Sequence, residues 1–528
     1  MNSHLHSSLE PLEDRIAPAG IVTVTIVAGN VTLTGDAADN VVEIDPGDPT
    51  QLHLIATSGT QFHFGTNPLT ASMFVPGFSG DLKVALGVGV DTITLDKGTL
   101  PGNVILDGGS SDPNNYPGDT IKSGPPINAG NLGDHIIAGN LTLKGSTGFD
   151  DINLTANQFL VGGDVNIPLG SGANTVALNA VALTVMGDFH YTTTGNSENS
   201  TLNVTGAKFI IGGDTTATVS QADSYVTFNA SDTAFFGGKV TITGGAVGIG
   251  HVFTVHADND LAIKGAVTMT CPNLGLDSFD LSSNGNLAVG GKVMIAGGPG
   301  GDTVTISAAN ARFMSDLIAT SSGGLAFTLT ATSNLLVAGK LTVTGSSQAD
   351  AISVTAPGTV VGLATFALGA GTADTFALKG TAASDLILLS NVKLTATGAT
   401  GTTTSTFSDL TIFGSLMLTT GAAADKVSFD NLTLFGATTV SLGAGVDQFN
   451  FETGGLAGTS TVGAAMNILL GLGNDKAFIG NNSANDRVIF NVASILNAGA
   501  GAGDITATMA YGNVFNQPLT VLFSETSA

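Results

Sequence analysis

The stretch that decides the fold is Gly339–Leu378, GKLTVTGSSQADAISVTAPGTVVGLATFALGAGTADTFAL, which contains one pattern twice. Each copy has a short strand of alternating apolar residues, a glycine-rich turn that ends on an aspartate, and a second alternating strand. The two aspartates are Asp350 and Asp374. Strict alternation predicts strands with one buried face. The stretch therefore predicts a repeat built of short strands and tight turns.

The same pattern recurs along most of the chain with a period near 25 residues. A glycine opens each strand of the form glycine–polar–apolar–x–apolar, and neighbouring copies lie 24 to 27 residues apart, or twice 24. These glycines are Gly139, Gly163, Gly187, Gly213, Gly238, Gly265, Gly291 and Gly339. A period that tolerates slips of one or two residues is typical of stacked coils, because insertions fit into the turns.

The predicted fold is therefore all-β: a single-stranded parallel β-helix, or β-solenoid, right-handed and with about 25 residues per coil. Residues such as Val240 and Ile242 would point inward and stack on their counterparts one coil away, about 4.8 Å distant. Burial of each valine or isoleucine contributes roughly 1.5–3 kcal/mol, so the summed stacks hold a rod without disulfides. Hairpin turns typical of antiparallel sandwiches are rare in the sequence.

We expect one continuous domain. Residues 1–19 form a polar N-terminal targeting or disordered segment, and residues 20–528 form a solenoid of roughly 20 coils at the strand spacing of a β-sheet. The proline- and glycine-rich stretch near 107–126 is predicted to be a loop insertion. The low-complexity stretch Thr395–Ser408 predicts a coil with weak side-chain packing. The N-terminal segment and Asn513–Ala528 are candidate caps for the ends of the rod.

Composition excludes several classes of partner. The chain has 41 acidic and 16 basic residues, a formal charge of −25, so we expect no nucleic-acid partner. The single cysteine, Cys271, rules out an intrachain disulfide and is predicted to be a small buried side chain. No run approaches the roughly 18 uncharged apolar residues of a membrane helix, so no transmembrane segment is expected.

The N-terminal run Leu9–Ala19, LEPLEDRIAPA, carries a family resemblance. It resembles the LEPR/LEDR-type motif of large exported and surface-associated proteins of planctomycetes and related bacteria. The resemblance covers these residues only, and it implies export to the cell surface or the extracellular space rather than any activity. The alternative interpretation is a charged, disordered tail.

The aspartates that close the glycine-rich turns are the candidate site. Coils stacked in register would place many of them along one edge of the rod. Three copies of L-G-x-G-x-D, at Leu86–Asp91, Leu442–Asp447 and Leu470–Asp475, resemble the calcium-binding turn of RTX proteins. The resemblance implies Ca²⁺ ligands at Asp91, Asp302, Asp350, Asp374, Asp425, Asp447 and Asp475, and the same series includes Asp223, Asp277 and Asp504.

The sequence departs from the RTX pattern, since its turns recur once per coil of about 25 residues rather than every nine. Like charges on adjacent coils are unfavourable unless a cation or a proton neutralises them. The alternative is that each aspartate accepts backbone N–H bonds and closes its own turn without metal.

Catalysis has little support in the sequence. The neighbours Asp150 and Asp151 must face opposite ways on a strand, and so must His251 and His256. The absence of tryptophan and the four tyrosines leave few platforms for sugar rings. A polysaccharide-binding or polysaccharide-cleaving β-helix is the alternative from another class.

Outward threonine pairs suggest a further alternative, an ice- or crystal-surface-binding protein. The pairs are Thr241/Thr243, Thr303/Thr305 and Thr342/Thr344. We expect instead a non-catalytic structural or adhesive rod, exported to the cell surface or beyond, able to self-assemble and stabilised by weakly bound calcium. Its expected partners are further copies of itself or a cell-surface polysaccharide.

Overall fold

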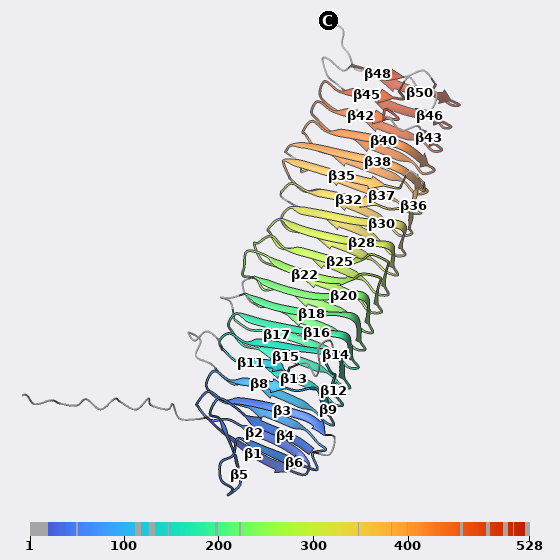
Figure 1. Cartoon of the computed structure of the whole chain (residues 1–528). Helices are drawn as coiled ribbons and strands as arrows, with labels where there is room; N and C mark the ends of the chain where they lie inside the picture. Colours follow the sequence, from blue (N-terminus) through green and yellow to red (C-terminus); the bar gives the residue numbers. More distant parts are fainter. Residues whose placement is uncertain are drawn as a thin grey trace, which may run out of the picture.

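The computed structural model describes residues 20–48, 51–110, 118–125, 132–145, 147–195, 199–220, 223–346, 348–381, 383–398, 400–454, 458–481, 486–499, 505–509 and 512–522. The predicted tail, residues 1–19, lies outside these ranges. Within them the chain forms strands and turns without any helix, and the strands stack into a long rod (Figure 1). Parallel coils repeat about every 25 residues through about 16 turns. The predicted parallel β-solenoid is confirmed.

Two sheets run along the rod, one of 21 strands (sheet A) and one of 29 strands (sheet B). Sheet A contains β1 (Ile21–Val27), β2 (Asn30–Thr34), β5 (Gln61–Phe64), β7 (Leu82–Ala85), β10 (Val104–Asp107), β13 (Leu141–Lys144), β15 (Val165–Leu169), β17 (Phe189–Thr193), β19 (Thr215–Thr218), β21 (Val240–Thr243), β24 (Val267–Thr270), β27 (Val293–Ala296), β29 (Leu317–Thr320), β31 (Leu341–Thr344), β34 (Ala364–Ala367), β37 (Val392–Ala396), β39 (Leu416–Thr420), β41 (Thr438–Ser441), β44 (Met466–Leu469), β47 (Ser494–Asn497) and β50 (Leu519–Leu522).

Sheet B is broader because most coils cross it with one long bent strand or with two short ones. It contains β3 (Val41–Asp48), β4 (Gln51–Ala56), β6 (Ser72–Pro76), β8 (Thr92–Leu95), β9 (Gly98–Leu100), β11 (Thr120–Ser123), β12 (His135–Ile137), β14 (Asp151–Val161), β16 (Asn174–Val185), β18 (Ser200–Ile211), β20 (Ser224–Phe236), β22 (His251–Ala257), β23 (Asp260–Ile263), β25 (Ser278–Ser283), β26 (Asn286–Val289), β28 (Asp302–Phe313), β30 (Leu325–Val337), β32 (Ala351–Thr355), β33 (Gly358–Val360), β35 (Ala373–Lys379), β36 (Leu386–Leu388), β38 (Thr402–Ile412), β40 (Lys426–Leu434), β42 (Gln448–Phe451), β43 (Gly458–Val462), β45 (Lys476–Ile479), β46 (Asp486–Phe490), β48 (Ile505–Met509) and β49 (Val514–Phe515).

The N-terminal end of the rod is closed by antiparallel pairs rather than by further parallel coils. Strands β1 and β2 form a hairpin through Ala28 and Gly29, which both have positive φ, and β4 pairs antiparallel with β3 and β6. Of the outermost strands, β6 pairs antiparallel with β4, whereas β5 pairs in parallel with β1. The expected number of about 20 parallel coils is therefore too high, since the chain up to Pro76 forms this cap.

The loop predicted near 107–126 is interrupted by a strand. β11 pairs in parallel with β8 before it and β14 after it, and Ile121 is buried in the core. Residues 111–117 and 126–131 lie outside the described part of the chain. The solenoid therefore keeps its register through this stretch.

The core forms as the alternating pattern predicts. In the stretch that decides the fold, Leu341, Val343, Ile352, Val354 and Phe376 are all buried. The low-complexity stretch agrees with its weak predicted packing, because the hydroxyl side chains of Thr403 and Ser405 occupy inward positions there. Cys271 is buried, as expected.

In several coils the glycine that opens a sheet A strand makes room for an outer ladder of asparagine and aspartate side chains. The residue after the glycine accepts the backbone N–H of its counterpart in the next coil: Asp164 Oδ1 from Asp188 at 2.8 Å, and Asp188 Oδ1 from Asp214 at 2.7 Å. A Cβ at Gly187 would contact Asp164 Oδ1 and lie 2.9 Å from the carbonyl oxygen of Gly163. Glycine therefore sets the spacing between coils at this corner.

We expect Gly187→Ala to lower the thermal unfolding midpoint clearly, because the new methyl group meets rigid backbone of the preceding coil. Overpacking of this kind costs about 1–3 kcal/mol. The matched control is Gly301→Ala, where a Cβ would meet only the flexible Leu276 Cδ2 at 3.1 Å. Thermal unfolding followed by circular dichroism measures both variants. Equal midpoints for the two variants would contradict this account of the repeated glycine.

Candidate functional site

The predicted calcium aspartates come together in one column, which we call the aspartate ladder. The strand register places equivalent residues of successive coils in line at the start of sheet B. All ladder side chains in the described coils are buried. The ladder consists of Asn40, Asp91, Asp119, Asp150, Asn174, Ser200, Ser224, His251, Asp277, Asp302, Leu325, Asp350, Asp374, Thr403, Asp425, Asp447 and Asp475.

The ladder contains two aspartates that the sequence pattern did not identify as site residues, Asp119 and Asp150. Asp119 was hidden in the predicted loop, although its context Gly118–Ile121 repeats the pattern of glycine, aspartate and alternating strand. Asp223 belongs to a neighbouring turn instead, where its Oδ1 accepts the N–H of Ile249 at 2.8 Å, while Ser224 occupies the ladder position. Asp504 lies outside the described residues.

Most of the ladder carboxylates link two coils. Asp447 Oδ1 accepts the N–H of Asp425 at 2.7 Å, and Asp475 Oδ1 accepts the N–H of Asp447 at 2.8 Å. Asp350 bonds to coils on both sides, since its Oδ1 accepts from Leu325 at 2.8 Å and its Oδ2 from Gly369 at 2.8 Å. The aspartates therefore accept backbone N–H bonds, as in the alternative interpretation, but these bonds run between coils rather than within one turn.

The second carboxylate oxygen is the unusual feature of the ladder. In several rungs Oδ2 is buried and has no hydrogen-bond partner among the described residues: Asp119, Asp374, Asp425 and Asp447. A buried, unpartnered oxygen strongly disfavours the ionised carboxyl group. Ionised carboxyl groups in the ladder therefore destabilise the folded rod, and a bound proton or cation would remove this destabilisation.

Burial raises the pKa of several ladder carboxyl groups. The pKa of Asp91 and that of Asp447 rise to about 7, and that of Asp302 rises to about 6. At Asp447 burial has the largest effect and the carboxylates of Asp475 and Asp425 raise the pKa further, although the N–H of Asp425 lowers it. These carboxyl groups therefore hold protons in the folded rod at pH values where an exposed aspartate is ionised.

We predict that the rod loses stability as the pH rises from about 5 to about 8. The folded pKa values of 6 to 7 exceed the ordinary value of 3.8, so the folded state binds more protons. The stabilisation is complete below about pH 4 and disappears as the pH rises through the folded pKa values. Thermal unfolding midpoints across this range measure the effect.

Asp447→Asn should flatten this pH dependence, because asparagine stays neutral and already occupies the ladder at Asn40 and Asn174. The control is Asp188→Asn in the outer ladder, whose side chain is 43% exposed. Two outcomes would contradict protonation of the ladder: the same change of unfolding midpoint with pH in Asp447→Asn and the wild type, or a wild-type midpoint that rises with pH.

Calcium binding along the ladder stays a prediction. The carboxylate oxygens are ligands that Ca²⁺ prefers, but Ca²⁺ takes about six to eight oxygens. A rung offers at most one free carboxylate oxygen, and neighbouring rungs are about 4.8 Å apart. The donor chemistry therefore fits the ion, while further ligands would have to come from backbone carbonyl groups.

If calcium binds the ladder, Ca²⁺ added after chelation should raise the unfolding midpoint at about pH 8 and have little effect at about pH 5, where protons hold the same carboxyl groups. The response should be smaller in Asp447→Asn than in Asp188→Asn. Calorimetric titration checks binding directly. No heat and no change in midpoint at about pH 8 would refute calcium binding.

One group of three possible metal ligands lies within 4.8 Å in the described part of the chain: His251, Cys271 and Asp277, all buried. His251 Nδ1 accepts the N–H of Ser224 at 3.1 Å, so the neutral ring carries its proton on Nε2. Burial also raises the pKa of the Cys271 thiol. A transition metal would need the Cys271 thiolate and a free imidazole lone pair, and the Nδ1 lone pair of His251 already accepts the Ser224 N–H.

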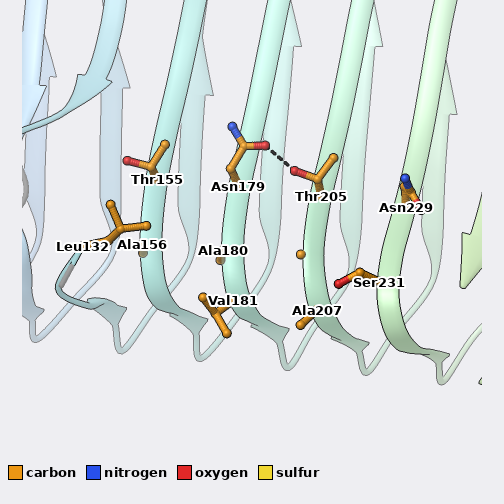
Figure 2. A pocket seen from close by; sticks show the side chains of 11 residues that line it. Leu132, Thr155, Ala156, Asn179, Ala180, Val181, Thr205, Ala207, Asn229 and Ser231 are labelled. Atoms are coloured by element: carbon orange, nitrogen blue, oxygen red, sulfur yellow. Dashed lines mark hydrogen bonds between the residues drawn. The ribbon is translucent and has the colours of Figure 1, made fainter. Parts of the chain in front are cut away.

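A groove with a volume of about 510 Å³ lies on the outer side of sheet B, where β14, β16, β18 and β20 bend (Figure 2). Thr155, Asn179, Thr205 and Asn229 line it in register, one from each strand. The hydroxyl of Thr205 donates to the side-chain oxygen of Asn179, as Figure 2 shows. The groove could not be identified from the sequence, because it depends on the bend of the strands.

Small residues follow the polar ones and allow the strands to bend. Ala156, Ala180, Gly206 and Ala230 occupy successive rungs. A Cβ at Gly206 would contact the carbonyl oxygen of Ala180 and lie 2.9 Å from Phe209 Cε1. The bend is therefore left open toward solvent as a groove rather than filled by side chains.

The polar column continues beyond the groove to His256 and Ser282. His256 is outward-facing and His251 is buried, as predicted, and Asp150 and Asp151 likewise face opposite ways. His256 Nδ1 lies 2.8 Å from Ser282 Oγ, its Nε2 lies 3.1 Å from Asp258 Oδ1, and the Ser282 hydroxyl donates to Asp280 Oδ2 at 2.9 Å. Since the serine proton goes to Asp280, these bonds fix the side chains in place without activating the hydroxyl.

No protein-family model matches the chain, and neither the curated proteins nor the solved structures include a match. In the described residues no helix is long and apolar enough to cross a membrane. The fold, the buried aspartate ladder and the groove are therefore the basis for assigning a function.

Proposed function

We propose that this chain is a non-catalytic structural and adhesive rod that acts outside the cell, at a bacterial surface or in the surrounding matrix. The observation that carries the proposal is the continuity of the two sheets through about 16 turns. Main-chain bonds join every coil to the next, so bending the rod would strain many bonds at once. Such a rod spaces or links objects at its ends and along its sides.

Export is supported by the N-terminal run Leu9–Ala19. An acidic surface keeps a long rod soluble and attracts cations. Weakly bound calcium at the aspartate ladder belongs to the same proposal, because it would tie rod stability to the cation content of the surroundings.

Self-assembly is supported by an exposed apolar stripe on one corner of the rod. Met314, Val361, Leu389, Phe413 and Phe435 occupy equivalent corner positions, and each is between 41% and 54% exposed. The rings of Phe413 and Phe435 stack with their centroids 4.8 Å apart. Exposed apolar stripes of this kind mark interaction surfaces. A second copy offers an identical stripe with the same spacing between coils.

Electron microscopy should show rods roughly 80 Å long, from about 16 turns at about 4.8 Å each. We expect side-by-side pairs that separate in Phe413→Ser/Phe435→Ser, while Met417→Ser, a change at an exposed apolar residue in sheet A strand β39, leaves them paired. Fractionation of the producing cells should place the protein at the surface or in the medium. Recovery from the cytoplasm alone would contradict an external role, and pairs that persist in the double variant would contradict the stripe.

A further inference from the structure

The polar column that lines the groove is longer than the groove itself. From Thr155 in β14 to Asp430 in β40, every in-register residue at this position has a hydrogen-bonding side chain. We call this column the polar track. It runs parallel to the rod axis, because each step follows the strand register from one coil to the next.

Solubility alone does not explain the polar track. The outward column of sheet A, on the same coils, includes Met294, Ile318 and Met417. Outward positions of this rod therefore tolerate large apolar side chains. In the polar track no position carries a large apolar side chain. This indicates a requirement for hydrogen-bonding groups on that face.

The groove has two chemically different walls. Thr155, Asn179 and Thr205 form one wall, as Figure 2 shows. Leu132, Val181 and Ala207 make the other wall mostly apolar, with the hydroxyl of Ser231 beside Ala207. Val181 is 57% exposed, so its apolar surface is available to a ligand. The residues that line the groove carry no charge. A ligand must therefore combine many hydroxyl groups with an apolar face and have no need of a counter-ion.

We propose that this groove binds a linear, uncharged polysaccharide that lies along the rod axis. Sugar hydroxyls bond to the track residues Thr155, Asn179, Thr205 and Asn229, and the C–H faces of the rings pack on Val181 and Leu132. Hydroxyl and amide side chains both donate and accept, which suits hydroxyl groups. The proposal rests on the adhesive part of the proposed function and names its partner.

An extended peptide fits the groove less well. The backbone N–H and C=O groups of β14, β16, β18 and β20 are engaged in the ladder between coils, so no free strand edge is available for β-strand addition. An anionic polymer is opposed by the net charge of −25. The charge and the hydrogen-bonding wall together favour an uncharged carbohydrate.

The test is electrophoresis of the full chain through gels that contain one soluble polysaccharide each: dextran, xylan, mannan, a mixed-linkage β-glucan, and alginate as the anionic comparison. We expect at least one uncharged polymer to retard the wild type. Asn179→Ala/Thr205→Ala should weaken that retardation about tenfold, since both partners of one hydrogen bond are removed together and sugar bonds are lost. Val181→Asp should weaken it by removing the apolar wall.

The matched control is Thr241→Ala/Thr268→Ala, an outward in-register pair on sheet A, which should bind like the wild type. Circular dichroism and thermal unfolding establish that each variant is folded. Retardation by alginate only, by none of the uncharged polymers, or equally in the groove variant and the wild type would overturn the proposal. Electron microscopy tests for the rod independently of polysaccharide binding. If rods are seen but no uncharged polysaccharide binds, only the binding proposal is contradicted. If rods are not seen, the structural function itself is contradicted.

Discussion

The structure depends on the main-chain hydrogen bonds that hold each coil in register with the next. Register places like positions on top of one another about 4.8 Å apart, so every side chain meets its counterpart in the neighbouring coil. This stacking favours valine, leucine and phenylalanine, which bury apolar surface against each other. The same stacking concentrates any polar or charged position into a continuous column, as in the aspartate ladder and the polar track.

The two columns show how one constraint has opposite consequences inside and outside the rod. Inside, carboxyl groups such as Asp447 gain an N–H bond from the neighbouring coil but keep a buried oxygen without a partner. Their ionised form is therefore costly, and protons or cations become part of rod stability. Outside, hydroxyl and amide groups in register destabilise the rod little, because solvent satisfies their hydrogen bonds. They form an ordered surface for a long ligand.

Much of the fold was predictable from sequence because strand and turn patterns are local. The alternation in Gly339–Leu378 identified the buried residues, and the glycine spacing identified the coil. The antiparallel cap was missed because its hairpin turns through Ala28–Gly29, which lacks the usual turn signature. Strand β11 was missed because prolines and glycines on both sides favoured a loop.

The sequence by itself determined that the chain forms parallel coils of about 25 residues, with aspartates recurring at one turn. Only the tertiary structure decided that these aspartates are buried, that most of them bond to the preceding coil, and that Asp119 joins them while Asp223 does not. It alone revealed the groove. The reason is that burial and register are properties of neighbouring coils, whereas periodicity describes one coil at a time and cannot say which way the strands bend.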